Sequence, residues 1–155
     1  MMNDLDRLDR KILKLLQEDG RITTVDLADK VGLSPTAASE RVKRLFRERY
    51  ILGFRAMLDP KKLGRGMLIF IEVSLDKTTP DVFERFADSV KRAPEVLECH
   101  MVAGGFDYLI KTRVPDMASY RSFLGDVLLS LPGVRESRTY AVMEEVKTDG
   151  VLPVD

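Results

Sequence analysis

Apolar residues near the start of the chain recur at three- and four-residue steps, which predicts helices rather than strands. A first helix is expected over residues 5–20, with acidic residues near its start and Gly20 as its stop. A second, short helix is predicted between an N-cap at Thr23 or Thr24 and Gly32. Gly32 ends this helix because the left-handed C-terminal conformation costs glycine least.

A third helix is predicted to begin directly after a short turn. Ser34 is a good N-cap, and Pro35 at the first helical position loses no hydrogen bond, so the helix extends from here to about Arg49. The turn 31–34 contains glycine, and two short helices joined in this way form the helix-turn-helix signature. In that motif the second helix lays its N-terminal half in the major groove of DNA.

The third helix has an apolar side for packing and a polar side. Small polar residues at its start suit base edges, and cations further along suit phosphates. The polar side is expected to carry Thr36, Ala37, Ser39, Glu40, Arg41, Lys43 and Arg44. The alternative is a purely structural three-helix bundle, but five cations against one acid within Arg41–Arg49 favour DNA binding.

Residues 50–66 are expected to separate two domains. A loose apolar alternation over Tyr50–Asp59 predicts a strand that closes the first unit. Turn-forming Asp, Pro and Gly residues in 59–66 predict a linker. We therefore expect a DNA-binding domain over 1–60 and a second domain over 67–155.

The second half of the chain carries an internal repeat of strand, helix and strand. The first copy has a strand over Met67–Leu75, a helix from Thr79 to Pro94 and a strand over Val96–Ala103. After two glycines the pattern restarts about 38 residues on, with a strand over Phe106–Val114, a helix to Leu131 and a strand over Val134–Val146. Two such units give the ferredoxin-like βαββαβ arrangement, so the fold class is α+β. Both helices cover one sheet face, and apolar residues on the other face predict a dimer or larger assembly.

Composition narrows the functional class. Hydrophobic residues make up 45% and charged residues 32% of the 155 residues, as in a soluble globular protein. Lys+Arg and Asp+Glu are each 25, so any nucleic-acid-binding surface must be local. One cysteine and no apolar signal region indicate the cytoplasm, and no apolar run is long enough for a membrane span.

No enzyme, metal or nucleotide site is recognisable in the pattern. Cys99 and His100 are neighbours on a predicted strand and point to opposite faces, which argues against a nucleophile–base pair. Glu144 and Glu145 are also neighbours on a predicted strand and point to opposite faces, which argues against a general acid/base pair. The turn Gly104–Asp107 precedes a strand rather than a helix, so it is a close-approach hairpin and not a phosphate loop. Asp107 either caps this hairpin or binds a ligand ammonium, and both readings stay open. We predict no cofactor.

Several segments together resemble the leucine-responsive regulatory protein (Lrp)/AsnC family. The N-terminal ones are Leu5-Asp6-x-x-Asp9-x-x-Ile12-Leu13, Asp19-Gly20-Arg21, Leu27-Ala28-x-x-Val31-Gly32-Leu33-Ser34-Pro35-Thr36 and Glu40-Arg41-Val42-x-Arg44-Leu45. The C-terminal ones are Glu98-Cys99-His100, Phe106-Asp107-Tyr108-Leu109, Leu131-Pro132-Gly133-Val134, Thr139-Tyr140 and Met143-Glu144-Glu145-Val146. The resemblance covers essentially the whole chain, in order, and is nearest to the leucine-responsive branch.

The resemblance implies a transcriptional regulator with a winged helix-turn-helix domain and a ferredoxin-like effector-binding domain. Family members regulate genes of amino-acid metabolism, dimerise through their sheets and assemble into tetramers, octamers or larger multimers. Amino-acid effectors bind between dimers, and here leucine, another apolar amino acid or proline is expected. The alternative is an architectural, nucleoid-type protein that wraps DNA without a ligand. The chain also begins close to its first helix, without the basic leader of some relatives, which predicts weaker non-specific DNA affinity.

The resemblance also implies site residues. The DNA-binding set is Thr23, Ser34, Pro35, Thr36, Ala37, Ser39, Glu40, Arg41, Lys43, Arg44 and Arg47. The effector-binding set is Met101, Gly104, Gly105, Phe106, Asp107, Met117, Leu129, Tyr140, Ala141 and Val142. Asp107 would bind the effector ammonium. Backbone N–H groups of the turn Gly104–Asp107, called the glycine turn below, would bind the effector carboxylate. Relatives commonly carry Asp or Asn at the position of Gly105.

Overall fold

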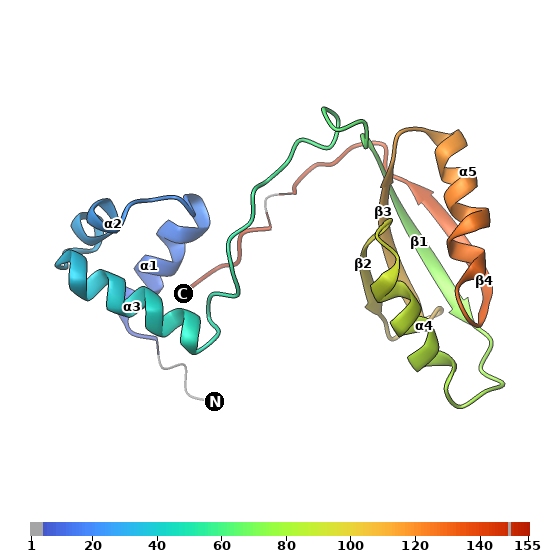
Figure 1. Ribbon diagram of the computed structural model, residues 1–155, viewed down its shortest axis with the longest axis horizontal. Helices are drawn as coiled ribbons and strands as arrows, with labels where there is room; N and C mark the ends of the chain where they lie inside the picture. Colours follow the sequence, from blue (N-terminus) through green and yellow to red (C-terminus); the bar gives the residue numbers. More distant parts are fainter. Residues whose placement is uncertain (1–4, 149) are drawn as a thin grey trace. The chain divides into compact units, whose positions relative to one another are not determined.

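The chain forms two compact units in the computed structural model, which describes residues 5–148 and 150–155 (Figure 1). The first unit extends to Met57 and includes the chain from Lys147 onward, and the second is Leu58–Val146. The sequence predicts one domain over 67–155, whereas the final residues group with the first unit. Among the described residues, no helix has the length and apolarity to span a bilayer.

The first unit is built from three helices. They are α1 (Arg7–Glu18), α2 (Thr24–Val31) and α3 (Pro35–Arg47). Thr23 and Ser34 are the N-caps of α2 and α3, and each side chain accepts a hydrogen bond from a backbone N–H in the first turn. Gly32 ends α2 in the left-handed conformation with φ 74°. The predicted helix-turn-helix is confirmed.

A small apolar core holds the three helices together. Its buried members are Ile12 from α1, Leu27 and Val31 from α2, and Leu45 from α3. Burying a side chain of this kind stabilises the fold by about 1.5–3 kcal/mol. Asp9 is also fully buried, and among the described residues of this unit it is the one charged or polar side chain that is.

The prediction of a strand over Tyr50–Asp59 is wrong, because this segment forms no strand in the structure. The segment has no sheet partner in the described part of the chain, and residues 52–59 are all exposed. Leu52 and Met57 are 81% and 87% exposed. An alternating pattern makes a strand only where another strand pairs its backbone N–H and C=O groups.

The second unit is a four-stranded antiparallel sheet with two helices. Its elements are β1 (Met67–Leu75), α4 (Val82–Arg92), β2 (Val96–Met101), β3 (Tyr108–Val114), α5 (Met117–Asp126), the 3-10 turn η1 (Leu128–Ser130) and β4 (Val134–Ala141). The strand order is β2-β3-β1-β4, with every neighbouring pair antiparallel. This is the predicted ferredoxin-like arrangement, and the α+β class is confirmed.

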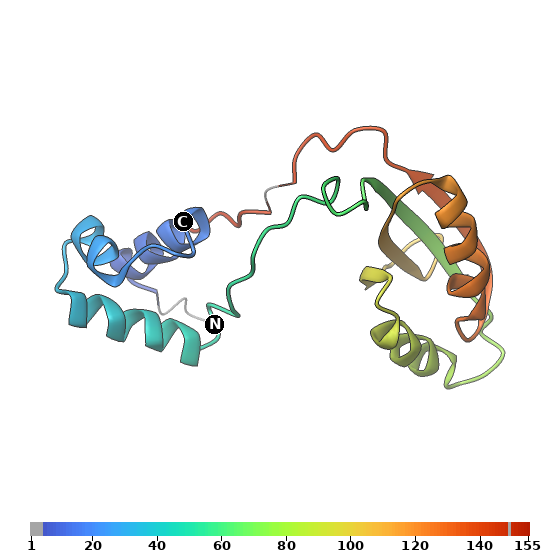
Figure 2. The ribbon, with the colours of Figure 1, turned by 45° about the horizontal axis from the view of Figure 1, so that its top comes forward.

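Both helices pack on the same face of the sheet (Figure 2). Ile69, Ile71 and Val73 of β1 and Ile110 of β3 form one core with Phe86 of α4. The opposite face is mixed rather than simply apolar. Its members include Leu68, Phe70, Glu72, Leu109, Lys111, Arg113, Arg138 and Tyr140, which are paired across β1, β3 and β4.

Helix α3 ends at Arg47 rather than at about Arg49, and three elements of the second unit also end earlier than predicted. Strand β4 stops at Ala141, and the N–H of Val142 still donates to the carbonyl of Leu68, one residue from the start of β1. Strand β2 stops at Met101, where the hairpin to β3 closes. Helix α5 ends at Asp126 and continues as the 3-10 turn η1.

Candidate nucleic-acid interface and effector site

Helix α3 presents one exposed stripe. Thr36, Glu40, Lys43 and Arg47 are all exposed and lie three or four residues apart, so they share a face opposite the buried Leu45. Thr23, Ser34 and Pro35 are exposed at the helix starts, and Ala37 and Ser39 are half-buried beside the stripe. Lys43 donates to Glu40 at 2.8 Å, and this contact lowers the pKa of Glu40 below its ordinary value.

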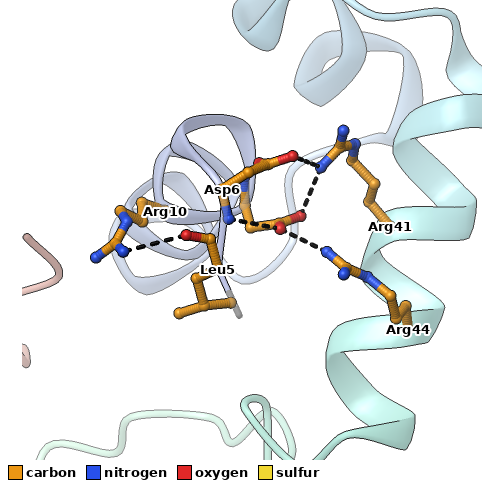
Figure 3. Close-up of polar contacts among 6 residues, drawn as sticks. Leu5, Asp6, Arg10, Arg41 and Arg44 are labelled. Atoms are coloured by element: carbon orange, nitrogen blue, oxygen red, sulfur yellow. Dashed lines mark hydrogen bonds and ion pairs between the residues drawn. The ribbon is translucent and has the colours of Figure 1, made fainter. Parts of the chain in front are cut away.

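Arg41 and Arg44 lie elsewhere, against α1 (Figure 3). The Arg41 guanidinium donates to Asp6 at 2.6 Å and to Asp9 at 2.9 Å, and Arg44 donates to the other oxygen of Asp9. Their side chains are 28% and 31% exposed. This corrects the expectation that both arginines belong to the outward face of α3, and their part in DNA binding stays a prediction.

The two carboxylates also cap α1. Asp6 accepts from the N–H of Asp9 at 2.8 Å, and Asp9 accepts from the N–H of Asp6 at 3.1 Å, which is a reciprocal capping box. The Asp9 N–H, followed by the Arg41 guanidinium, lowers the pKa of Asp6 to about 2. The hydrogen bonds from Arg41 to Asp6 and Asp9 in turn raise the pKa of Arg41.

The glycine turn of the second unit is held to β1 by Asp107. One carboxylate oxygen accepts from the N–H of Leu75 at 2.8 Å, and the other pairs with the Lys77 ammonium at 2.9 Å. The Asp107 side chain is only 14% exposed. Burial alone would raise its pKa, but the Leu75 N–H and Lys77 outweigh this and lower it. Asp107 therefore closes the turn and already binds an ammonium group.

Two shallow cavities meet at this turn. One has a volume of about 190 Å³, and the other about 300 Å³, at the small end for ligand sites. Both are lined by Ser74, Gly105 and Phe106. A Cβ at Gly104 or Gly105 would meet nothing within 4 Å, so these glycines leave open space beside the turn.

The structure brings together only part of the predicted effector set. Gly104, Gly105, Phe106 and Asp107 line these cavities, whereas Met101, Met117, Leu129, Tyr140, Ala141 and Val142 do not. The sequence pattern does not predict the charged lining residues Glu72, Lys77, Arg135, Glu136 and Arg138. Glu72 lies on β1, Lys77 lies just after it, and the other three lie along β4. Charged residues at such positions are typical of any solvated surface, so no sequence signal distinguishes them.

The remaining chemistry candidates lie apart from one another. Cys99 packs against the core and burial raises its pKa to about 11, whereas His100 is exposed beside Glu98 on the other face. Within 5–148 and 150–155, no group of three or more metal-ligating side chains could hold an ion.

A helix-turn-helix unit and a ferredoxin-like unit with polar cavities, in one chain, define a DNA-binding regulator with a separate ligand-binding domain. The chain belongs to the Lrp/AsnC family, because the AsnC-type helix-turn-helix domain matches residues 5–45 and the Lrp/AsnC ligand binding domain matches residues 68–152. It is a DNA-binding transcriptional regulator that responds to an amino-acid effector. The family is one of transcription regulators and not of enzymes.

Known relatives match the chain over nearly its whole length. It is 54% identical over 151 residues to the leucine-responsive regulatory protein of Escherichia coli (strain K12), covering 97% of this chain and 92% of that protein. The crystal structure of the transcriptional regulator NMB0573/L-Met complex from Neisseria meningitidis matches with a TM-score of 0.93 and 39% identity, covering 97% of both chains. The leucine response regulatory protein LrpA of Mycobacterium tuberculosis matches at 0.80 and 28% identity, covering 97% of this chain and 100% of that chain.

Proposed function

We propose that the chain recognises an operator through α3 and binds a small amino acid at the glycine turn, with assembly into dimer multiples linking the two events. The exposed stripe of Thr36, Glu40, Lys43 and Arg47 supports the first part, because it combines small polar and cationic groups on one helix face. The observation that carries the second part is the ion pair between Asp107 and Lys77.

This ion pair has the chemistry that an amino acid requires. The effector ammonium replaces the Lys77 ammonium on Asp107, and Lys77, with Arg135 in the same cavity lining, then faces the effector carboxylate. An exchange of one ammonium for another leaves the charge of the site balanced. The relatives, a leucine-responsive regulatory protein and a regulator in complex with L-Met, favour leucine, methionine or another apolar amino acid, with proline as a further candidate.

The apolar end of the effector needs an apolar lining, and the two cavities supply large apolar side chains only at Phe106 and Leu75. Met101, Met117 and Leu129 are 64%, 48% and 59% exposed. Large exposed apolar side chains of this kind favour an interaction surface. We assign these three residues, with Tyr140–Val142, to a site completed by a neighbouring copy in a tetramer or octamer.

The test is the mass of the protein by light scattering after size exclusion, without and with each amino acid at millimolar concentration. One apolar amino acid is expected to shift the mass between dimer multiples. In Asp107→Asn the shift should disappear, because the amide keeps an acceptor for Leu75 N–H but loses the charge that holds an ammonium.

The matched control is Asp88→Asn, which removes an exposed α4 carboxylate paired with Lys91 and should respond like wild type. An unaltered shift in Asp107→Asn would place the effector elsewhere. No shift with any amino acid, together with equal affinity for selected and unselected DNA, would favour the ligand-independent DNA-wrapping protein.

A further inference from the structure

Asp9 is a fully buried carboxylate between α1 and α3. Its side chain is 0% exposed, while the paired Arg41 and Arg44 side chains keep 28% and 31% of their surface. Each of its two oxygens accepts from a different arginine of α3, and one also accepts the N–H of Asp6. Both oxygens are therefore engaged.

The arrangement is better explained by geometry than by stability. Taking charges out of water is costly, and apolar residues of similar volume often replace a buried ion pair with no loss of stability. A forked contact does something that an apolar contact does not. Two guanidinium groups one helical turn apart on α3 must both reach a single carboxylate, which fixes the rotation and position of α3 against α1.

The same contacts balance the charge beside the exposed stripe. Asp6 and Asp9 carry two negative charges, and Arg41 and Arg44 carry two positive charges. The sequence pattern predicts that these guanidinium groups bind DNA phosphates, but in the structure they bind carboxylates of the same unit. Phosphate contacts add affinity for any sequence, so their number sets the non-specific background.

We propose that Asp9 is a positioning residue for sequence discrimination: it orients α3 and withholds the charges of Arg41 and Arg44 from DNA phosphates. This inference rests on the proposed function, in which α3 is the recognition helix. Asp9 contacts no DNA itself. It raises the ratio of operator to non-specific affinity by acting on both terms of that ratio.

The experiment uses the full chain and two duplexes of equal length, one selected by the wild-type protein from a random library and one unselected. Asp9→Asn is expected to bind the unselected duplex more tightly than wild type. The slope of log affinity against log salt should steepen by about 0.9 for each arginine that reaches a phosphate. The ratio of selected to unselected affinity should fall about tenfold, within the ~10³–10⁷ range of such ratios.

Glu18→Gln is the matched control, since it removes the same charge from the exposed C-terminal end of α1 and should leave the ratio unchanged. Asp6→Asn is the milder variant: asparagine still caps α1, and Arg41 loses one of its two charged partners and keeps Asp9. It should show a smaller effect of the same sign, which keeps the test decisive if Asp9→Asn does not fold.

A purely structural role would give a different result. If Asp9 and Asp6 only stabilise the fold, their loss lowers the affinity for both duplexes by the same factor and leaves the salt slope unchanged. This result in Asp6→Asn and Asp9→Asn proteins that are folded overturns the inference. If the wild-type protein itself shows no preference for any duplex, the proposed function fails instead. Wild-type preference with an unaltered ratio in both variants refutes only the role of Asp9.

Discussion

Asp6 is a half-exposed carboxylate whose ionised form is stabilised in the folded state. Its pKa falls from 3.8 to about 2 because of the Asp9 N–H and Arg41. A lowered folded-state pKa contributes stability that is present above the ordinary value and is lost as pH falls through the folded value. We therefore expect the unfolding free energy of wild type to exceed that of Asp6→Asn above about pH 4 and the difference to vanish near pH 2.

Urea unfolding of both proteins at a series of pH values measures this difference. High salt should reduce the share that comes from Arg41 and leave the share from the Asp9 N–H. A difference between the two proteins that persists undiminished to pH 2 would contradict the assignment of the lowered pKa to this carboxylate.

At the residue scale, the sequence predicts caps well and long-range partners poorly. Ser34 and Gly32 are recognisable because a cap acts on its own helix, within a few residues. The sequence predicts that Asp9 is an acidic residue in the first turn of a helix, and the structure confirms this. Its bonds to Arg41 and Arg44 span 32 and 35 positions, so they depend on how the helices pack.

The same contrast appears among the elements. Strand β1 is predictable because its strict alternation matches a sheet with one fully buried face. The segment Tyr50–Asp59 has a similar but looser pattern and forms no strand, because no neighbour in the described chain pairs with it. Periodicity reports which face an element would bury, and pairing depends on what the rest of the fold places beside it.

The C-terminal segment was expected in the second domain, and in the structure it contacts α1 of the first unit. The Gln17 side chain on α1 donates to the carbonyl of Leu152 at 2.9 Å and accepts from its N–H at 2.8 Å. Val154 then lines a groove with Leu5 and Val31. A two-bond amide pair of this type has no hydrophobic pattern, which is why periodicity does not detect it.

We expect Gln17→Ala to release this segment from α1. Two exposed hydrogen bonds contribute about 1 kcal/mol together, so amide exchange at Leu152 should speed up roughly fivefold. Gln17→Glu keeps the acceptor for the Leu152 N–H and should give a smaller increase. Hydrogen–deuterium exchange resolved to single amides measures both, and equal exchange in all three proteins would show that the pair does not hold the segment.

For the whole molecule, the two units are joined by more than one stretch of backbone. The chain leaves the first unit after Met57, forms the second, and returns to the first from Lys147 onward. Strand β4 ends at Ala141, a few residues before this return, so the strand beside the glycine-turn cavities continues into the segment that binds α1. In the proposed function, effector binding at the turn and DNA binding by α3 therefore act on two units that two backbone segments join.

This connection makes a quantitative prediction about effector and DNA. If an amino acid changes operator affinity by some factor, the operator must change affinity for that amino acid by the same factor, because the coupling free energy is shared. A typical coupling of 1–3 kcal/mol corresponds to about 5–150-fold. Titrating each ligand in the absence and presence of the other, at one fixed protein concentration and salt, measures both factors.

Gln17→Ala should lower both factors together if the segment from Lys147 onward carries the coupling. Factors that remain at their wild-type value in Gln17→Ala would assign the coupling to the 58–66 linker or to assembly between copies, and a factor of one in both directions would leave the effector without influence on DNA.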